Sequence, residues 1–365
     1  MTATVRRLIV HTVDVPLVRP FITAVRRTDA ITAVLVEAVD SDGRSGWGEA
    51  AASWRVTGES PASIRAAVMG PLSDAVLGSE LDDVDRLADH LAAAVIQNAA
   101  ARCAVECALH DLAAAASGVP LWAHLGGRTN SVTTDMTLSA ASTSELIELA
   151  IGHRDAGFRT LKLKVGAGRD DVHSVAAVRD AVGADVSLRV DANQGWTARQ
   201  AIDIIRDWED ASVGIELVEQ PVSARNRDDL AFVTARVQTP ILADEAVWTS
   251  HDLSAIIAGR MADAVNIKLA KSGGLTEARR MIALAAANDI GVLIGCMMES
   301  HVGIAAAASL AASLGDPARA HDLDAGLWLA ASPVDSGPHY TADSVVLSRA
   351  AGTGITGLCA SGGRP

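Results

Sequence analysis

The feature that most constrains the fold is a repeat that begins near residue 130. Each unit has a short β-branched run that ends in a polar residue, then a Gly or Asn turn, then an amphipathic helical pattern. Five consecutive runs end in a charged residue, at Lys164, Asp191, Glu219, Asp244 and Lys268, so these ends are 27, 28, 25 and 24 residues apart. A strand followed by a helix needs about this length. The repeat therefore predicts parallel strands joined by right-handed helical crossovers.

Eight such runs are present, which is the number that closes into a barrel. They cover residues 132–138, 160–164, 186–191, 215–219, 241–244, 264–268, 291–296 and 320–324. Eight parallel strands of this type are expected to form a (β/α)8-like barrel of about 250 residues or slightly fewer. An open, doubly wound sheet is the alternative, but such a sheet does not usually end five consecutive strands in charged residues.

The residues before and after the barrel follow a different pattern. Alternating β-rich runs at 8–18 and 31–40 precede helical patterns at 63–77 and 82–116, which is typical of an α+β unit. The Gly-rich tail has no room in the barrel and is expected to return to this first unit. We therefore predict an α+β domain, a barrel domain and a returning tail, at residues 1–125, 126–334 and 335–365.

The charge balance excludes two classes of partner. The chain has 31 Lys and Arg against 44 Asp and Glu, a formal net charge of −13. This charge disfavours phosphate backbones and anionic lipid, so neither nucleic acid nor a membrane is expected as a partner. Four cysteines are few for 365 residues, and no stretch reaches about 18 uninterrupted apolar residues. A cytoplasmic location is the simplest expectation.

Three carboxylates are expected to meet at one mouth of the barrel. In parallel barrels the last residue of each strand points into the active-site mouth, and Asp191, Glu219 and Asp244 end three adjacent strands. Without a cation these groups would raise one another's pKa. All-oxygen ligands suit Mg²⁺ better than zinc, so the three residues are predicted metal ligands. The alternative is that each carboxylate caps a helix or forms a structural ion pair.

Lysines flank these carboxylates on two other strands. Lys162 and Lys164 alternate with apolar residues, so both are expected to face the barrel interior. Neighbouring cations lower the pKa of a buried lysine toward the ~7–8 that suits a general base. We predict that Lys164 accepts a proton, that Lys162 holds a substrate oxygen, and that Lys268 faces the substrate from the opposite side. Alternatively, these lysines only pair with the carboxylates.

Ordered sequence motifs carry a further signal. They are TLKLKVG (160–166), RVDANQGW (189–196), ELVEQP (216–221), ILADEAV (241–247), NIKLAKSGG (266–274) and, near the N-terminus, GWGEA (46–50). Together they resemble the enolase superfamily, in its muconate lactonizing enzyme subgroup. The resemblance implies a (β/α)7β modified TIM barrel with an α+β capping domain that the N-terminal part and the tail form. It also implies removal of a proton α to a carboxylate, with Mg²⁺, or Mn²⁺ in its place, stabilising the enolate.

The last predicted strand discriminates among the members of this subgroup. Asp322 and Asp324 place two carboxylates on one side of an extended segment, which suits an ammonium and disfavours an anionic acyl group. Here the chain resembles dipeptide epimerases, in which an Asp-x-Asp binds the free α-amino group of the substrate. We therefore expect a Mg²⁺-dependent isomerase that uses two lysines to epimerise dipeptides of the L-Ala-D/L-Glu type.

Other activities of the subgroup stay open at this point. An o-succinylbenzoate synthase, an N-acylamino acid racemase or a muconate cycloisomerase would need no ammonium site. A non-catalytic metal-dependent binder is a further alternative, which the presence of both Lys164 and Lys268 with three carboxylates disfavours.

Three further substrate contacts are implied by the resemblance. Residues 20–26 resemble a loop of the L-Ala-D/L-Glu epimerases, in which the counterpart of Arg26 binds the glutamyl carboxylate. Residues 296–300 resemble a segment of the same enzymes, so Met298 and Glu299 are expected near the substrate. The expected partner is a small dipeptide, and relatives imply a homo-oligomer.

Overall fold

A seven-stranded parallel sheet forms the centre of the computed structural model, which describes residues 3–22, 27–139, 141–316 and 319–359. The sheet order is β11-β10-β9-β8-β7-β6-β5, so neighbours along the chain are neighbours in space. Its strands are β5 (Met136–Leu138), β6 (Thr160–Lys164), β7 (Ser187–Asp191), β8 (Ile215–Glu219), β9 (Ile241–Ala243), β10 (Ala264–Lys268) and β11 (Gly291–Gly295). This sequential parallel order confirms the predicted barrel architecture and excludes the doubly wound alternative.

The eighth strand expected at 320–324 is reduced to isolated bridges. His321 pairs with Thr134 and Asp322 with Gly295, which closes the ring between β11 and β5. The Leu323 N–H donates to the Thr134 Oγ1 (2.9 Å), so a side chain takes the place of a ladder carbonyl. The short helix α14 (Ala325–Trp328) follows at once. The prediction of a regular strand here was wrong in this respect.

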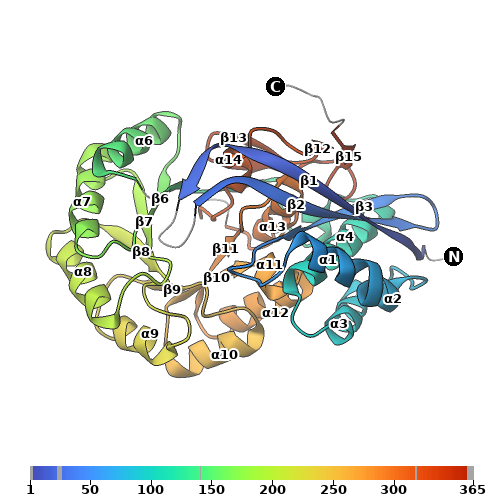
Figure 1. Cartoon of the computed structure of the whole chain (residues 1–365), viewed down its shortest axis with the longest axis horizontal. Helices are drawn as coiled ribbons and strands as arrows, with labels where there is room; N and C mark the ends of the chain where they lie inside the picture. Colours follow the sequence, from blue (N-terminus) through green and yellow to red (C-terminus); the bar gives the residue numbers. More distant parts are fainter. Residues whose placement is uncertain (1–2, 23–26, 140, 317–318, 360–365) are drawn as a thin grey trace.

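Helices cover the outside of the sheet in an arc, except that α11 (Leu269–Ser272) and α13 (His301–Ala312) lie between the sheet and the cap (Figure 1). The others are α6 (Thr143–Asp155), α7 (Asp170–Val182), α8 (Ala198–Asp210), α9 (Arg227–Thr234), α10 (Ser250–Gly259) and α12 (Leu275–Ala286). The local sequence determines where several of these helices begin. The side chains of Ser142, Thr197 and Thr249 form capping boxes with the third residue of α6, α8 and α10.

An antiparallel sheet and several helices form the cap. The sheet order is β1-β2-β3, and the long β1–β2 hairpin reaches from the cap over the barrel mouth (Figure 1). The strands are β1 (Val5–Ile22), β2 (Arg27–Asp40) and β3 (Ser45–Ala51). The helices are α1 (Pro61–Ala67), a π-helical turn (Val68–Leu72), α2 (Ser73–Val76), α3 (Val84–Ala94), α4 (Ala99–Ala116) and α5 (Leu121–His124).

The helix expected over 82–116 is two helices, α3 and α4. The first helix ends at an extended Val95, and Gln97 and Asn98 have φ of 59° and 48°, in the left-handed region, which redirects the chain before α4 begins. The helix expected over 63–77 begins earlier, at Pro61, and Pro71 lies in the π-helical turn that interrupts it. In both cases apolar periodicity continues across a break in the backbone.

The tail contacts both the cap and the barrel. The run expected at 132–138 is two strands, because β4 (Ser131–Thr133) leaves the barrel and pairs with the hairpin of β13 (His339–Thr341) and β14 (Ser344–Val346). A second pair, β12 (Val334–Ser336) with β15 (Ile355–Leu358), packs Val334 and Ile355 against Val15 and Ile31 of the cap. The tail therefore bridges the two larger units.

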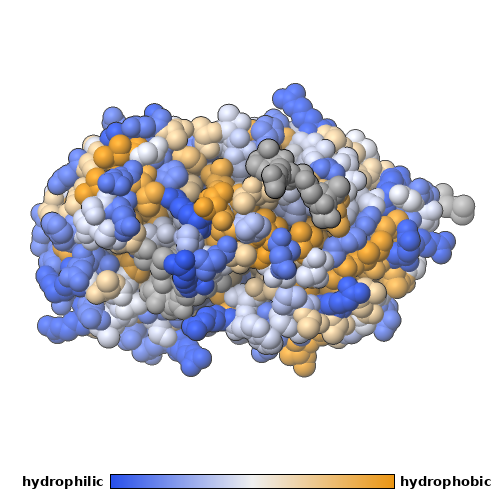
Figure 2. Space-filling view, turned by 45° about the horizontal axis from the view of Figure 1, so that its top comes forward, coloured by the Kyte–Doolittle hydropathy of each residue, from blue (hydrophilic) through white to orange (hydrophobic). Residues whose placement is uncertain are grey.

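The surface is mixed in polarity. Figure 2 shows hydrophilic residues around the edge of one face, with hydrophobic patches between them. Within the described ranges, no helix combines the length and apolar content that crossing a membrane requires.

Candidate active site

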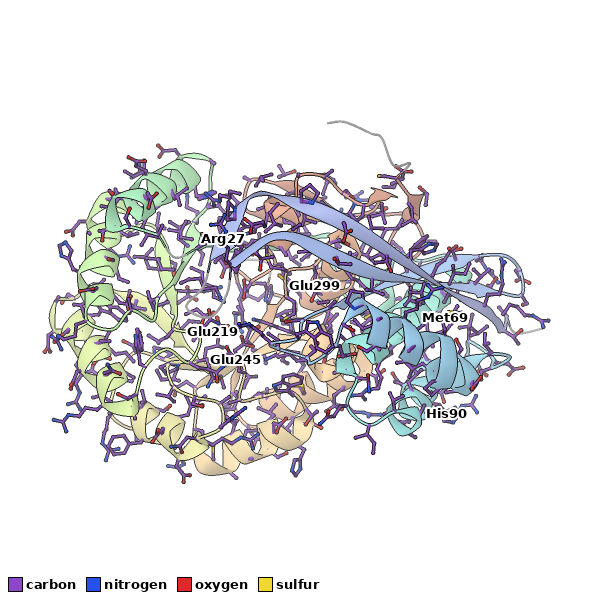
Figure 3. The ribbon with its side chains drawn as sticks, viewed as in Figure 1. Arg27, Met69, His90, Glu219, Glu245 and Glu299 are labelled. Atoms are coloured by element: carbon purple, nitrogen blue, oxygen red, sulfur yellow. The ribbon has the colours of Figure 1, made fainter. Side chains whose placement is uncertain are left out.

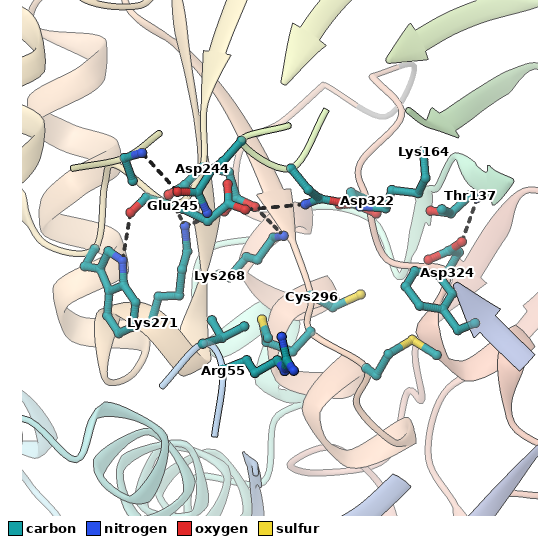
Figure 4. A pocket seen from close by; sticks show the side chains of 18 of the residues that line it. Arg55, Thr137, Lys164, Asp244, Glu245, Lys268, Lys271, Cys296, Asp322 and Asp324 are labelled. Atoms are coloured by element: carbon teal, nitrogen blue, oxygen red, sulfur yellow. Dashed lines mark hydrogen bonds and ion pairs between the residues drawn. The ribbon is translucent and has the colours of Figure 1, made fainter. Parts of the chain in front are cut away.

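A cavity of about 470 Å³ opens at the carboxyl ends of the barrel strands. Phe21 and Arg55 of the cap line one side, and Lys164, Asp244 and Lys268 of the barrel line the other (Figure 4). The strand ends therefore meet in one cavity, as the repeat spacing predicted. The cap completes that cavity, so neither unit forms it alone.

Lys162 lies behind the cavity wall at the centre of an ion cluster. Its side chain is 1% exposed, and its Nζ is 2.5 Å from Glu219 Oε2, 2.8 Å from Asp322 Oδ2 and 3.2 Å from Asp191 Oδ2. One ammonium thus joins the ends of β7 and β8 to the segment that closes the barrel. Lys162, Asp191 and Glu219 lie directly behind the residues that line the cavity, and Asp191 contacts the lining residue Lys164.

Lys164 and Lys268 line the cavity from two separated strands, β6 and β10. Lys164 Nζ is 2.5 Å from Asp191 Oδ2, and Lys268 Nζ is 2.8 Å from Asp244 Oδ2. Figure 4 shows the two side chains on different sides of the cavity. Two amines therefore face the same space, each held by its own carboxylate.

The ion pairs reverse the expected direction of the lysine pKa shift. Burial alone would lower the pKa of Lys162, but attraction by Asp322, Glu219 and Asp191 holds it well above its ordinary value. For Lys268, Asp244 and Glu219 likewise outweigh burial and raise the pKa. The expectation of a lowered pKa was wrong for Lys162, because carboxylates lie closer to its Nζ than other cations do.

The three predicted metal ligands lie close together, and their carboxylate oxygens form ion pairs with lysine side chains. Among the described residues, no three His, Cys, Asp or Glu side chains are arranged as preformed ligands. The donor set nevertheless fits a hard cation. Burial and Asp191 raise the pKa of Glu219 to about 7, and burial and Asp244 raise that of Glu245 to about 7. Buried oxygens of Asn193 and Glu245 also lack a hydrogen-bond partner. A divalent cation would relieve both conditions.

Lys271 is a site residue that the sequence analysis missed. It is 2% exposed, and its Nζ is 2.5 Å from Asp244 Oδ1 and 3.0 Å from the Val247 carbonyl. Asp244 therefore lies between two lysines, Lys268 and Lys271, which hold its pKa well below the ordinary range although burial alone would raise it. The i,i+3 spacing of these lysines after a strand end was the available signal.

The Asp322 and Asp324 carboxylates both reach the cavity but differ in environment. Burial would raise the pKa of Asp322, yet Lys162 and Lys268 hold it at about 2. The Asp324 Oδ2 accepts hydrogen bonds from the Thr137 N–H (2.7 Å) and the Trp328 Nε1–H (3.1 Å). Burial and Asp322 raise the pKa of Asp324. This end of the cavity is therefore anionic, with Asp324 fixed in orientation.

The remaining predicted contacts have three different outcomes. Arg26 lies outside the described residues. Met298 lines the cavity, whereas Glu299 lies outside its lining and its Oε1 accepts a hydrogen bond from the Met297 N–H (3.0 Å). Burial, followed by Glu49, raises the pKa of Glu299 to about 8. Figure 3 shows Glu219, Glu245 and Glu299 beneath the hairpin end that carries Arg27.

A capped parallel barrel with lysines on two strands and acidic residues at the intervening strand ends defines a class of enzyme. Residues 5–126 match the mandelate racemase / muconate lactonizing enzyme N-terminal domain, and residues 145–357 match the enolase C-terminal domain-like family. The chain belongs to the enolase superfamily.

Individual relatives narrow the comparison within this family. The L-Ala-D/L-Glu epimerase of Clostridium acetobutylicum is 35% identical over 355 residues, covering 97% of this chain and 99% of the relative. The substrate-liganded L-Ala-D/L-Glu epimerase of Bacillus subtilis has a TM-score of 0.95 at 37% identity, covering 98% and 100%. The Enterococcus faecalis dipeptide epimerase complexed with Mg and L-Leu-L-Tyr has a TM-score of 0.92 at 34% identity, covering 98% and 100%.

Proposed function

We propose that this protein is a Mg²⁺-dependent dipeptide epimerase, an isomerase that inverts the α-carbon of the C-terminal residue. The observation that carries the proposal is one cavity with Lys164 and Lys268 on different sides and Asp322 and Asp324 at a third position. The relatives described above, which include a Mg and dipeptide complex, support this substrate class and cofactor.

The carboxylates Asp191, Glu219 and Asp244 are the proposed holders of Mg²⁺, with Mn²⁺ as the expected substitute. When bound, the cation supplies electrostatic stabilisation of the charge that develops on the substrate carboxylate. The chain contributes the rest. Lys162, already 2.5 Å from Glu219, adds a fixed positive charge beside these oxygens.

Lys164 and Lys268 are the proposed acid and base. In one direction the Lys164 Nζ takes the α-proton from one face of the substrate, and the Lys268 Nζ returns a proton to the other face. The roles exchange for the reverse direction. Removal of a proton from one face and delivery of a second proton to the opposite face invert the centre, whereas a single amine would deliver a proton to the face from which it took one.

Asp322 and Asp324 are proposed to bind the substrate's free α-amino group. Two carboxylates with one ammonium between them form charge-assisted hydrogen bonds, worth about 1.5–3 kcal/mol each. The same pair repels an N-acyl or dicarboxylate substrate. This is the feature that disfavours o-succinylbenzoate synthase, N-acylamino acid racemase and muconate cycloisomerase activities.

Residues at the cavity rim are proposed to select the epimerised side chain. Arg26 is the proposed partner of a glutamyl carboxylate, and Met298 is a proposed neighbour of the same carboxylate. Glu299 is proposed to support the cavity wall behind Met298.

All four cysteines are free, which supports a cytoplasmic location. We also propose that the protein acts as a homo-oligomer, as the resemblance to the superfamily implies.

Proton NMR in D2O tests the proposal directly. The enzyme with Mg²⁺ is mixed with L-Ala-L-Glu, with other L,L-dipeptides and with N-succinyl amino acids, and the α-proton signal is followed. Loss of this signal with appearance of the L,D-diastereomer is expected only from substrates with a free amine. Exchange confined to N-acyl substrates would overturn the assignment of Asp322 and Asp324.

Variants of the two lysines separate their roles. Lys268→Ala is expected to stop epimerisation while leaving some α-proton exchange of one diastereomer, because one amine is still present. Lys164→Ala is expected to leave exchange of the other diastereomer. Unchanged turnover in Lys164→Ala would favour a non-catalytic role for this lysine.

A further inference from the structure

Glu49 is a buried carboxylate to which the proposed reaction gives no role. It lies on β3 in the GWGEA segment and is 4% exposed. Its oxygens accept hydrogen bonds from the Ser300 N–H (2.9 Å), the Ser300 Oγ (2.6 Å) and the Gly303 N–H (2.9 Å). Glu49 belongs to the cap, whereas Ser300 and Gly303 belong to the barrel.

The strand that carries Glu49 is fixed on the cap. A Cβ at Gly46 would lie 2.3 Å from the Ala108 carbonyl oxygen, and a Cβ at Gly48 would lie 2.0 Å from the Ala104 carbonyl oxygen. The β3 backbone therefore lies directly on α4, closer than any side chain would allow. Glu49 is presented to the barrel from a strand that has little room to shift.

The barrel groups that Glu49 binds are the first turn of α13. The first N–H groups of a helix lack partners within the helix and carry partial positive charge, so a carboxylate there is stabilising. Ser300 also caps this helix through its own Oγ, which accepts from the Val302 N–H (3.2 Å). Burial raises the pKa of Glu49, while the hydrogen bonds from Ser300 and Gly303 oppose that shift.

The segment just before α13 is a wall of the active-site cavity. Cys296, Met297 and Met298 all line that cavity. The Cys296 N–H donates to the Asp322 carbonyl (3.0 Å), which holds the β11 end of the segment. The opposite end is Ser300, which Glu49 holds. The wall is thus fixed at one end by the barrel and at the other by the cap.

We propose that Glu49 is a positioning residue, which sets the wall of residues 296–298 by holding the start of α13 from the cap. The GWGEA segment then has a defined purpose: two glycines bring the strand onto α4, and the glutamate reaches across to the barrel. The kinetic part of this inference rests on the proposed function, whereas its structural part does not.

Glu49→Gln tests the proposal, because glutamine keeps the size but removes the charge and offers donors to N–H groups. Asp40→Asn is the matched control. Asp40 is 3% exposed in the same sheet and accepts from the Asp42 and Arg44 N–H groups (both 2.9 Å), but within the cap alone. Both changes remove one buried carboxylate charge, and only the first removes a link to the barrel.

The first readout needs no substrate. The alkylation rate of Cys296 by iodoacetamide is followed by peptide mass spectrometry. It is expected to rise about ten-fold in Glu49→Gln, the size of one lost charge-assisted hydrogen bond, and to stay at the native rate in Asp40→Asn. The second readout is steady-state kinetics with L-Ala-L-Glu. KM is expected to rise about ten-fold in Glu49→Gln while kcat changes about two-fold or less.

Each outcome bears on the proposal. Equal alkylation rates in Glu49→Gln and the native protein, or equal increases in both variants, would overturn it. If Glu49→Gln does not fold, Ser300→Ala decides by the same two readouts; it removes the Oγ bond to Glu49 and the Oγ bond from the Val302 N–H, and it keeps the backbone N–H bonds to Glu49. Faster alkylation in a protein that epimerises no dipeptide would support the positioning role and refute the proposed function.

Discussion

Asp111 provides a quantitative test of how burial controls stability. This α4 residue is 2% exposed, and it accepts hydrogen bonds from the Trp47 N–H (2.7 Å) and the Thr353 N–H (2.5 Å). Burial outweighs these bonds and raises its pKa from 3.8 to about 6. The folded chain therefore binds this proton more tightly than the unfolded chain. Below about pH 4 the group is neutral in both states and costs nothing.

As pH rises from about 4 to 6, Asp111 loses its proton in the unfolded chain before it does so in the folded chain. The free energy of unfolding therefore falls over this pH range. Above pH 6 the cost levels off at about 3 kcal/mol, because each pKa unit is worth 1.36 kcal/mol. Urea unfolding of the native protein and of Asp111→Asn isolates this group. The native free energy of unfolding minus that of the variant should fall by roughly 1.5 kcal/mol between pH 5 and pH 8.

The exposed Asp82 supplies the control for the charge change. Asp82→Asn should give a difference from the native protein that varies little over the same pH range, since solvent screens an exposed charge. A pH-independent difference for Asp111→Asn would refute the reasoning, because it would mean that the hydrogen bonds fully compensate the buried charge.

Three further predictions concern packing, buried charge and metal. Arg189→Met should lower the free energy of unfolding, measured in urea, by about 3–5 kcal/mol. The reason is that the buried Asp135, which lies 3.0 Å from Arg189, then has no Arg189 partner. Adding Asp135→Leu to this variant should recover much of the lost free energy of unfolding. Gly48→Ala should cost about 1–3 kcal/mol through overpacking against α4, measured the same way. Mg²⁺ should raise the thermal midpoint of the native protein but not that of Asp244→Asn, as scanning calorimetry would report.

The residue ranges of the barrel strands could be predicted closely, because the sequence marks where each strand ends. The strands at 160–164, 215–219 and 264–268 have the predicted bounds, since a charged residue ends each run. The break between α3 and α4 could not be predicted in this way, because helical periodicity carries no information about the left-handed φ of Gln97 and Asn98. The division of the chain at residues 125 and 334 stays a prediction.

The sequence could predict that the site residues lie close together, but not which charged side chains pair with one another. Strand ends of a parallel barrel must meet, so Lys164, Asp191 and Lys268 followed from spacing alone. Which lysine pairs with which carboxylate depends on side-chain reach across the mouth. Lys162 therefore became the centre of the cluster rather than a cavity residue. Glu49 was hidden for a different reason: its partners lie some 250 positions later in the sequence.

The seam where the barrel closes has a consequence for how such enzymes change substrate. Residues 320–324 join their neighbours through single bridges, not through a continuous ladder. Asp322 in this segment pairs with Lys162 at 2.8 Å, so it joins the seam to the ion cluster. Asp324 instead accepts hydrogen bonds from the Thr137 N–H and the Trp328 Nε1–H. Under the proposed function, recognition of the substrate's amino end can therefore diverge at Asp324 with less effect on the lysine–carboxylate pairs than at Asp322.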